Sequence, residues 1–84
     1  MSVISRFYGI IIRMYFQQAE HNPPHIHAIY GEEVAAIDIQ TYEVMEGQLP
    51  PKILTMIREW VQIHQKELFH MWDTQEFKPL SPLE

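Results

Sequence analysis

The sequence predicts an α+β fold, in which a three- to four-stranded antiparallel sheet is followed by one long C-terminal amphipathic helix packed on one sheet face. Three observations lead to this prediction. In the first half of the chain, apolar residues alternate with the period of a half-buried strand. Residues 31–33, Gly-Glu-Glu, are a short turn between two such segments. In the second half, apolar residues recur every three or four positions, which is the period of a helix with one apolar stripe.

The length of 84 residues leaves room for one domain. We assign residues 1–74 to this α+β domain and residues 75–84, which contain two prolines and few apolar residues, to a C-terminal tail. Hydrophobic residues make up 46% of the chain and charged residues 20%, which is ordinary for a globular protein. This composition argues against a disordered chain.

The charge balance and the lack of cysteine limit which partners and which cellular location we expect for this protein. Eleven acidic residues against six Lys and Arg give a formal net charge of -5, which disfavours nucleic acid and anionic membranes as partners. The absence of cysteine excludes a disulfide-held secreted scaffold, so we expect a cytoplasmic protein. The apolar stretch 8–16 is too short to span a bilayer and lacks a cleavage site, so neither an anchor nor a signal peptide is expected.

The first predicted strand is Phe7–Phe16, with the sequence FYGIIIRMYF, which is rich in aromatic and β-branched residues. Alternation puts Arg13 and Tyr15 on one side of this strand. We expect the other side to be buried; it consists of Tyr8, Ile10, Ile12, Met14 and Phe16. The polar segment 17–24 ends in Asn-Pro-Pro and is predicted to be a loop, because proline removes backbone donors.

Two further strands follow at His25–Tyr30 and Val34–Ile39, and both alternate. Their expected buried sides are Ile26 and Ala28 in the first, and Ala35, Ile37 and Ile39 in the second. Residues 40–47 give a weaker pattern that is compatible with a fourth, edge strand whose charges discourage pairing with another sheet.

The predicted helix begins at Pro50 and Pro51, since proline is tolerated in the first turn, and runs to about Asp73. His64 is expected at the edge of the core with one hydrogen bond, and both tryptophans are expected to pack in the core. The apolar stripe that would lie on the sheet consists of Ile53, Ile57, Trp60, Val61, His64, Leu68, Met71 and Trp72. The tail could pack through Phe77 or Leu80.

The segment HNPPHIH, residues 21–27, concentrates three of the five histidines. His25 and His27 are two apart on a strand, so both imidazoles face the same side, a common way for a sheet to offer two ligands to one metal ion. A zinc or nickel site also needs a third ligand, which His21 in the loop or Asp38 in the third strand would supply. A bound divalent metal is therefore one hypothesis, and no other cofactor is expected.

The alternation also predicts which polar residues share the sheet side opposite the core. A register that buries the apolar sides puts Arg13, His27 and Asp38 side by side across three strands. A histidine between an arginine and an aspartate is oriented for acid–base catalysis or phosphate recognition. The favoured interpretation is simpler, namely cross-strand polar pairing worth roughly 0.2–1 kcal/mol per pair.

The segments SRFYGIIIRMYF, HNPPHIHAIYGE, AAIDI, EVMEGQLP and ELFHMW together resemble the bacterial domain-of-unknown-function 4160 family over nearly the whole chain. The opening strand and NPPHIHA are the most specific parts of the resemblance, and His25 and His27 fall on it. The resemblance implies no established activity. Because members resemble partners in small two-gene cassettes, it implies a toxin–antitoxin-like or regulatory role by analogy.

Three hypotheses about function remain. The lack of a complete catalytic motif favours a non-enzymatic interaction or regulatory module that binds a small partner protein or itself. The second hypothesis is a small phosphodiesterase or ribonuclease that uses His25 or His27 for proton transfer and Arg13 for phosphate. The third is a metal-binding protein that uses His21, His25 and His27. Whether the protein is an enzyme is left open by the sequence.

Overall fold

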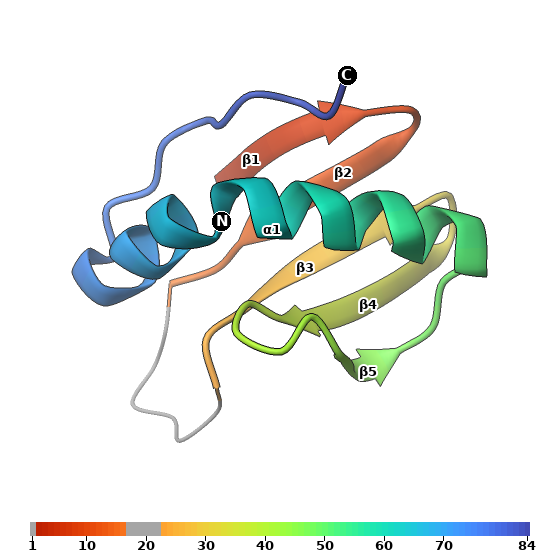
Figure 1. The fold of residues 1–84 in the computed structure, drawn as a ribbon, viewed down its shortest axis with the longest axis horizontal. Coiled ribbons are helices and arrows are strands. Elements are labelled where there is room, and N and C mark those ends of the chain that lie inside the picture. Colours follow the sequence, from red (N-terminus) through yellow and green to blue (C-terminus); the bar gives the residue numbers. More distant parts are fainter. Residues whose placement is uncertain (1, 17–22) are drawn as a thin grey trace.

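The computed structural model describes residues 2–16 and 23–84. Within them, five antiparallel strands form one sheet in chain order and one helix follows (Figure 1). The elements are β1 (Ser2–Phe7), β2 (Ile10–Met14), β3 (His25–Tyr30), β4 (Glu33–Asp38), β5 (Val44–Gly47) and α1 (Pro51–Thr74). The predicted α+β class, antiparallel sheet and C-terminal helix are confirmed, whereas the predicted number of three to four strands is wrong.

The additional strand arises because the predicted first strand contains a hairpin turn. Tyr8 and Gly9 have φ values of 49° and 80°, the positive values typical of a two-residue turn with the twist of its strands. Phe7 therefore pairs with Ile10 instead of preceding it in one strand. Tyr8 was predicted to be buried, but it is 60% exposed. Aromatic and β-branched residues continue through this turn, so its composition resembles that of the flanking strands.

One face of the sheet and one stripe of α1 form a shared hydrophobic core, and Figure 1 shows α1 crossing that face. The expected buried sides of β3 and β4 are fully buried, as are Ile10, Ile12 and Met14 of β2. The rings of Phe7 and Trp60 stack with centroids 5.8 Å apart, which joins β1 to the helix. The buried residues of α1 are Ile53, Ile57, Trp60, Val61, Leu68 and Met71, all of them in the predicted stripe.

Phe16, the last residue of the predicted first strand, was also expected in the core, but it is 61% exposed. β2 ends at Met14, so the strand alternation no longer fixes the direction of the Phe16 side chain. Its ring instead stacks on that of Phe77 with centroids 5.0 Å apart. The two aromatic residues thus contact each other beside the core.

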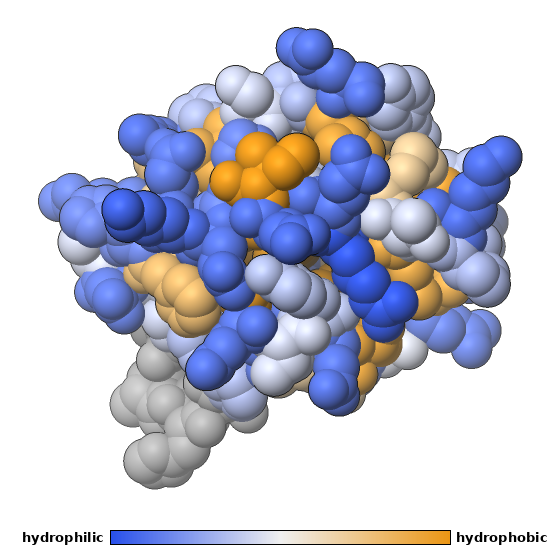
Figure 2. Space-filling model, in the orientation of Figure 1, coloured by the Kyte–Doolittle hydropathy of each residue, from blue (hydrophilic) through white to orange (hydrophobic). Residues whose placement is uncertain are grey.

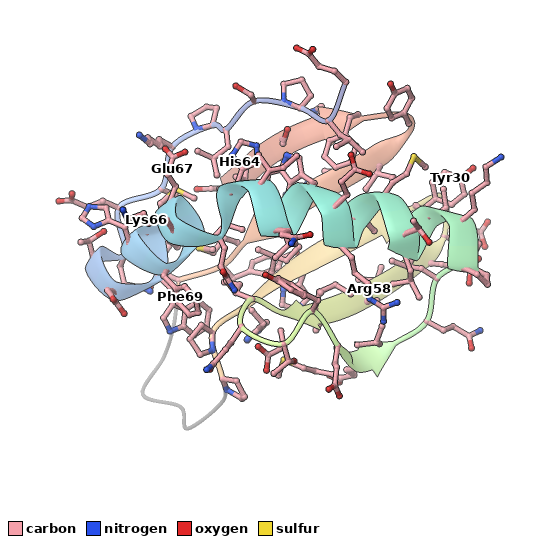
Figure 3. The ribbon with its side chains drawn as sticks, in the orientation of Figure 1. Tyr30, Arg58, His64, Lys66, Glu67 and Phe69 are labelled. Atoms are coloured by element: carbon pink, nitrogen blue, oxygen red, sulfur yellow. The ribbon has the colours of Figure 1, made fainter. Side chains whose placement is uncertain are left out.

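Residues 75–84 have no helix or strand, yet they are held against the rest of the molecule. The Leu80 side chain is buried, and its N–H donates to the Ile4 carbonyl at 2.8 Å. Trp60 Nε1 and His64 Nε2 donate to the Ser81 carbonyl at 2.8 and 2.9 Å. Figure 3 shows His64 and Glu67 on the side of α1 that this segment passes, and Glu67 lies 3.3 Å from the Lys78 ammonium.

The pairing of β5 with β4 depends on Gly47, the last residue of β5. Its φ of 82° is unfavourable for other residues, and a Cβ atom there would collide with the Val34 carbonyl oxygen. Glycine therefore lets β5 approach β4 closely. This approach fixes the position of Glu46, the preceding residue, on the sheet.

Candidate functional site

The side of the sheet that faces away from α1 carries the polar and charged residues that could form a functional site. Residues that pair directly across adjacent strands project to the same side, and the core uses the alternate positions. α1, the one helix among the described residues, lies on the core side (Figure 1). We call the other side the open face; its central residues are Ile11, Arg13, His27, Ile29, Val34, Ala36 and Glu46.

Two rows of residues cross the open face. In the first, which we call the His27 row, Arg13 pairs with His27, His27 with Ala36, and Ala36 with Glu46. Three strand spacings separate its charged ends, a span of about 14 Å. The second row, the apolar row, contains Ile11, Ile29 and Val34.

The predicted proximity of Arg13 and His27 is present, because the two residues are direct cross-strand partners. Asp38, however, is not in their row; it pairs with His25, two positions further along β3. Gly31 and Glu32 form a two-residue turn that pairs Tyr30 with Glu33, and this register puts Ala36 opposite His27. The predicted row of Arg13, His27 and Asp38 is therefore wrong by two residues on β4.

The Asp38 carboxylate serves the turn that leaves β4. Its Oδ1 accepts the N–H groups of Gln40 at 2.7 Å and Thr41 at 3.0 Å. The Asp38 carbonyl accepts from the Tyr42 N–H at 2.9 Å, and Tyr42 takes a left-handed φ of 68°. An aspartate that bonds to the backbone two residues on is a common turn-forming device. The structure thus gives Asp38 a local structural role.

His27 lies in the middle of the His27 row in a tightly packed setting. Its ring contacts the rings of Tyr15 and His25 edge to face, with centroids 4.7 and 5.1 Å away. Burial, and to a lesser extent the nearby His25, lower the pKa of His27 from 6.5, whereas Glu46 opposes this shift. Its Nδ1 is buried and has no hydrogen-bond partner among the described residues. Neutral imidazole is therefore the favoured form at pH 7.

A hollow of about 300 Å³ opens beside His27. Val34 and Glu46 form parts of its wall, and the small residues Ala36 and Gly47 leave the space. Arg13, His25 and Asp38 do not line it. The four candidate catalytic residues therefore do not converge on this concavity.

His25 is oriented by the backbone and by the helix. Its Nδ1 donates to the Pro23 carbonyl at 2.8 Å, so Nε2 keeps its lone pair in the neutral ring. The His25 ring also lies against Trp72 of α1, with centroids 5.1 Å apart. The imidazole rings of His25 and His27 thus lie next to each other, with centroids 5.1 Å apart.

The structure adds little to the metal hypothesis. His21, its third proposed ligand, lies outside the described residues. Within residues 2–16 and 23–84, no group of three or more His, Cys, Asp or Glu side chains is arranged to hold a metal ion. The hypothesis therefore depends on ligands beyond those described.

Sequence reasoning overlooked Glu46 and gave Tyr15 no role. Strand alternation gave no signal for Glu46, because Val44 and Glu46 are two residues apart and strict alternation would put both on the same side of the strand. In the structure Val44 pairs with Ile37 on the core side and Glu46 pairs with Ala36 on the open face, because the register shifts between Ala36 and Ile37. Tyr15 was assigned to the same side as Arg13, and its ring does contact His27 there.

Charge is distributed unevenly across the open face. Arg6 pairs with Ile11, so it joins Arg13 at the β1–β2 end, while Glu46 lies at the β5 end. By contrast, Figure 2 shows the α1 side as largely hydrophilic with small, separate apolar areas. The described residues also contain no helix long and apolar enough to cross a membrane.

The fold and these sheet faces define a small antiparallel sheet protein with a C-terminal helix, and sequence comparison assigns it to a family. The profile of the domain of unknown function DUF4160 matches residues 9–73, and the chain belongs to this family. The matched range extends from the β1–β2 turn almost to the end of α1. No curated protein and no solved structure matches the chain.

Proposed function

We propose that this protein is a non-enzymatic protein-interaction module whose docking surface is the open face. The observation that carries the proposal is the apolar row, in which Ile11 and Ile29 are partly exposed and Val34 is 46% exposed. Interface centres combine apolar and aromatic side chains with arginine. Tyr15 and Arg13 supply the latter two beside the apolar row.

The arrangement of the polar residues also supports binding over catalysis. An enzyme site gathers its reactive groups around a concave space. Here Asp38 serves a turn, and Arg13 lies outside the hollow that His27 lines. The arrangement of the open face thus favours a protein-binding surface over a catalytic site.

The family resemblance supports a partner encoded nearby. Members resemble components of two-gene cassettes, so we propose the product of the adjacent gene as the first protein to test. A toxin–antitoxin-like or regulatory role in the cytoplasm would follow from such a pair. The Arg6 and Arg13 end of the open face favours a partner surface that carries carboxylates.

The test compares two matched substitutions of exposed aliphatic residues. Val34→Glu places a charge in the apolar row, while Ile63→Glu places one on α1, where Ile63 is 63% exposed. Binding to the adjacent gene product, and self-association, are measured by calorimetry and light scattering. The proposal expects V34E to abolish the association that wild type shows and I63E to retain it. Equal effects of the two variants, or a wild-type protein that binds neither partner, contradict it.

A second candidate function is a small phosphodiesterase or ribonuclease, which is favoured by the pairing of Arg13 with His27. Arg13 would hold a phosphate while His27 or His25 transfers a proton. RNA cleavage by His27→Ala and His25→Ala is compared with cleavage by His70→Ala, a change at an exposed helix position. This function predicts loss of cleavage in H27A, in H25A or in both, and none in H70A. Equal cleavage in all three variants contradicts it.

A further inference from the structure

We propose that the open face binds the open face of a second copy of this chain, related to the first by a two-fold axis parallel to the strands. This inference rests on the proposed function and names the partner. The axis lies between β3 and β4, in the plane of the interface. Such an arrangement is isologous, so each contact occurs twice.

The order of charges along the His27 row makes the open face complementary to itself. Arg13 and Glu46 lie at opposite ends of the row, on β2 and β5. Rotation about the proposed axis reverses the strand order but keeps each row opposite itself. Arg13 of one copy then faces Glu46 of the second copy, and Glu46 faces Arg13. Two ion pairs of opposite charge result, one at each side of the interface.

The same rotation brings the apolar row against itself. Ile29 on β3 faces Val34 on β4 of the second copy, and the reverse contact is equivalent. Face-to-face sheets of this kind pack aligned, about 10 Å apart, with their inner side chains interdigitating. The partly exposed aliphatic side chains of the apolar row would thereby become buried.

The hollow beside His27 provides a place for a ring from the second copy. His27 of one copy faces Ala36 of the other, because these residues are adjacent in the row on either side of the axis. Ala36, Val34 and Gly47 line the hollow of about 300 Å³. The imidazole of the second copy can occupy this space, which replaces a void with packed atoms.

A second copy explains the open face better than a partner of uniform charge. Such a partner would match either the Arg13 end or the Glu46 end, and like charges would meet at the other. The chain as a whole has a formal net charge of -5, so two copies repel each other at long range. Local pairing of Arg13 with Glu46 and burial of the apolar row are thus the features that would hold the copies together.

The test is a charge exchange measured on the full chain by sedimentation equilibrium, up to about 1 mM so that a weak complex is detected. Arg13→Glu and Glu46→Arg each place like charges opposite one another, and we expect each to weaken dimerisation at least about ten-fold. The double variant R13E/E46R restores opposite charges and should recover most of the wild-type affinity. Lys66→Glu and Glu59→Arg, at exposed positions of α1, make the same changes in net charge and should leave dimerisation unchanged.

A monomeric wild type at the highest concentration, or a double variant no better than the singles while all remain folded by circular dichroism, overturns the inference. The proposed function is judged separately. If V34E still abolishes binding to the adjacent gene product although the wild type is monomeric, the open face is an interface for that protein and the second-copy inference alone fails. If the protein dimerises but the charge exchange has no effect, the proposed arrangement of the copies is wrong.

Discussion

Arg13 on β2 lies directly opposite His27 on β3, and Glu46 lies two strands beyond His27 in the same row. This relationship gives His27 a cation on one side and a carboxylate on the other. Its buried Nδ1 lacks a hydrogen-bond partner among the described residues. A substitution of His27 should therefore affect both the stability of the fold and the charge pattern of the open face.

The stability of the protein should decrease as the pH falls below about 6.5, in part because of His27. Burial and His25 lower the pKa of His27 in the folded state, and the opposing effect of Glu46 is smaller. Between 6.5 and that lower pKa, the unfolded state binds more protons, so acid favours unfolding there; below both pKa values this contribution is constant. Urea unfolding of wild type and His27→Gln at about pH 7.5 and pH 5 measures the effect.

The free energy of unfolding of H27Q should vary less with pH than that of wild type. His70→Gln, at an exposed helix position, is the control and should keep the wild-type dependence. Parallel pH profiles for wild type and H27Q would show that His27 does not cause the pH dependence of the free energy of unfolding.

Asp38 should tolerate asparagine but not alanine. Asparagine keeps an oxygen that can accept from the Gln40 and Thr41 N–H groups, whereas alanine leaves both to water. Because these bonds are exposed, we expect D38A to cost about 1 kcal/mol and D38N less. Thermal unfolding measures both. A catalytic role would instead predict that D38N removes activity, so an activity lost in D38N at unchanged stability would refute the structural assignment.

Gly47→Ala should be much more destabilising than Gly31→Ala. Both glycines have positive φ, but a Cβ at Gly31 meets open space, while one at Gly47 collides with the Val34 carbonyl. We expect G31A to cost about 1–2 kcal/mol from backbone strain alone and G47A to cost more. Urea unfolding gives the two values, and hydrogen exchange should show β5 opening in G47A. Equal costs would mean that β5 does not depend on this close approach.

Leu80→Ala should destabilise the protein by about 2 kcal/mol or more, because Leu80 is 8% exposed and packs in the hydrophobic core. Leu83→Ala is the matched control, since Leu83 is only partly buried at the edge of that core. Its cost should be clearly smaller. If neither substitution lowers the melting temperature, the C-terminal segment does not contribute to the fold in solution.

The sequence predicted those features that depend on periodicity. Alternation identified the buried sides of β3 and β4, and the two prolines marked the start of α1 at residue 51. Periodicity could not reveal the turn at Tyr8 and Gly9, because the residues around it have the composition of a strand. It also could not fix strand register, which is why Asp38 was assigned to the row that Glu46 occupies. Register depends on the length of a turn, and a change of two residues preserves every buried side.

The most direct test of the open face as an interface between two copies of this chain is a dilution series followed by amide NMR of ¹⁵N-labelled protein, from about 1 mM to about 20 µM. Dimerisation through the open face predicts that concentration changes the amide shifts of this face, centred on Arg13, His27 and Val34, and leaves those around Ile63 unchanged. Shifts that are independent of concentration, or that change mainly on the exposed side of α1, would contradict dimerisation through the open face.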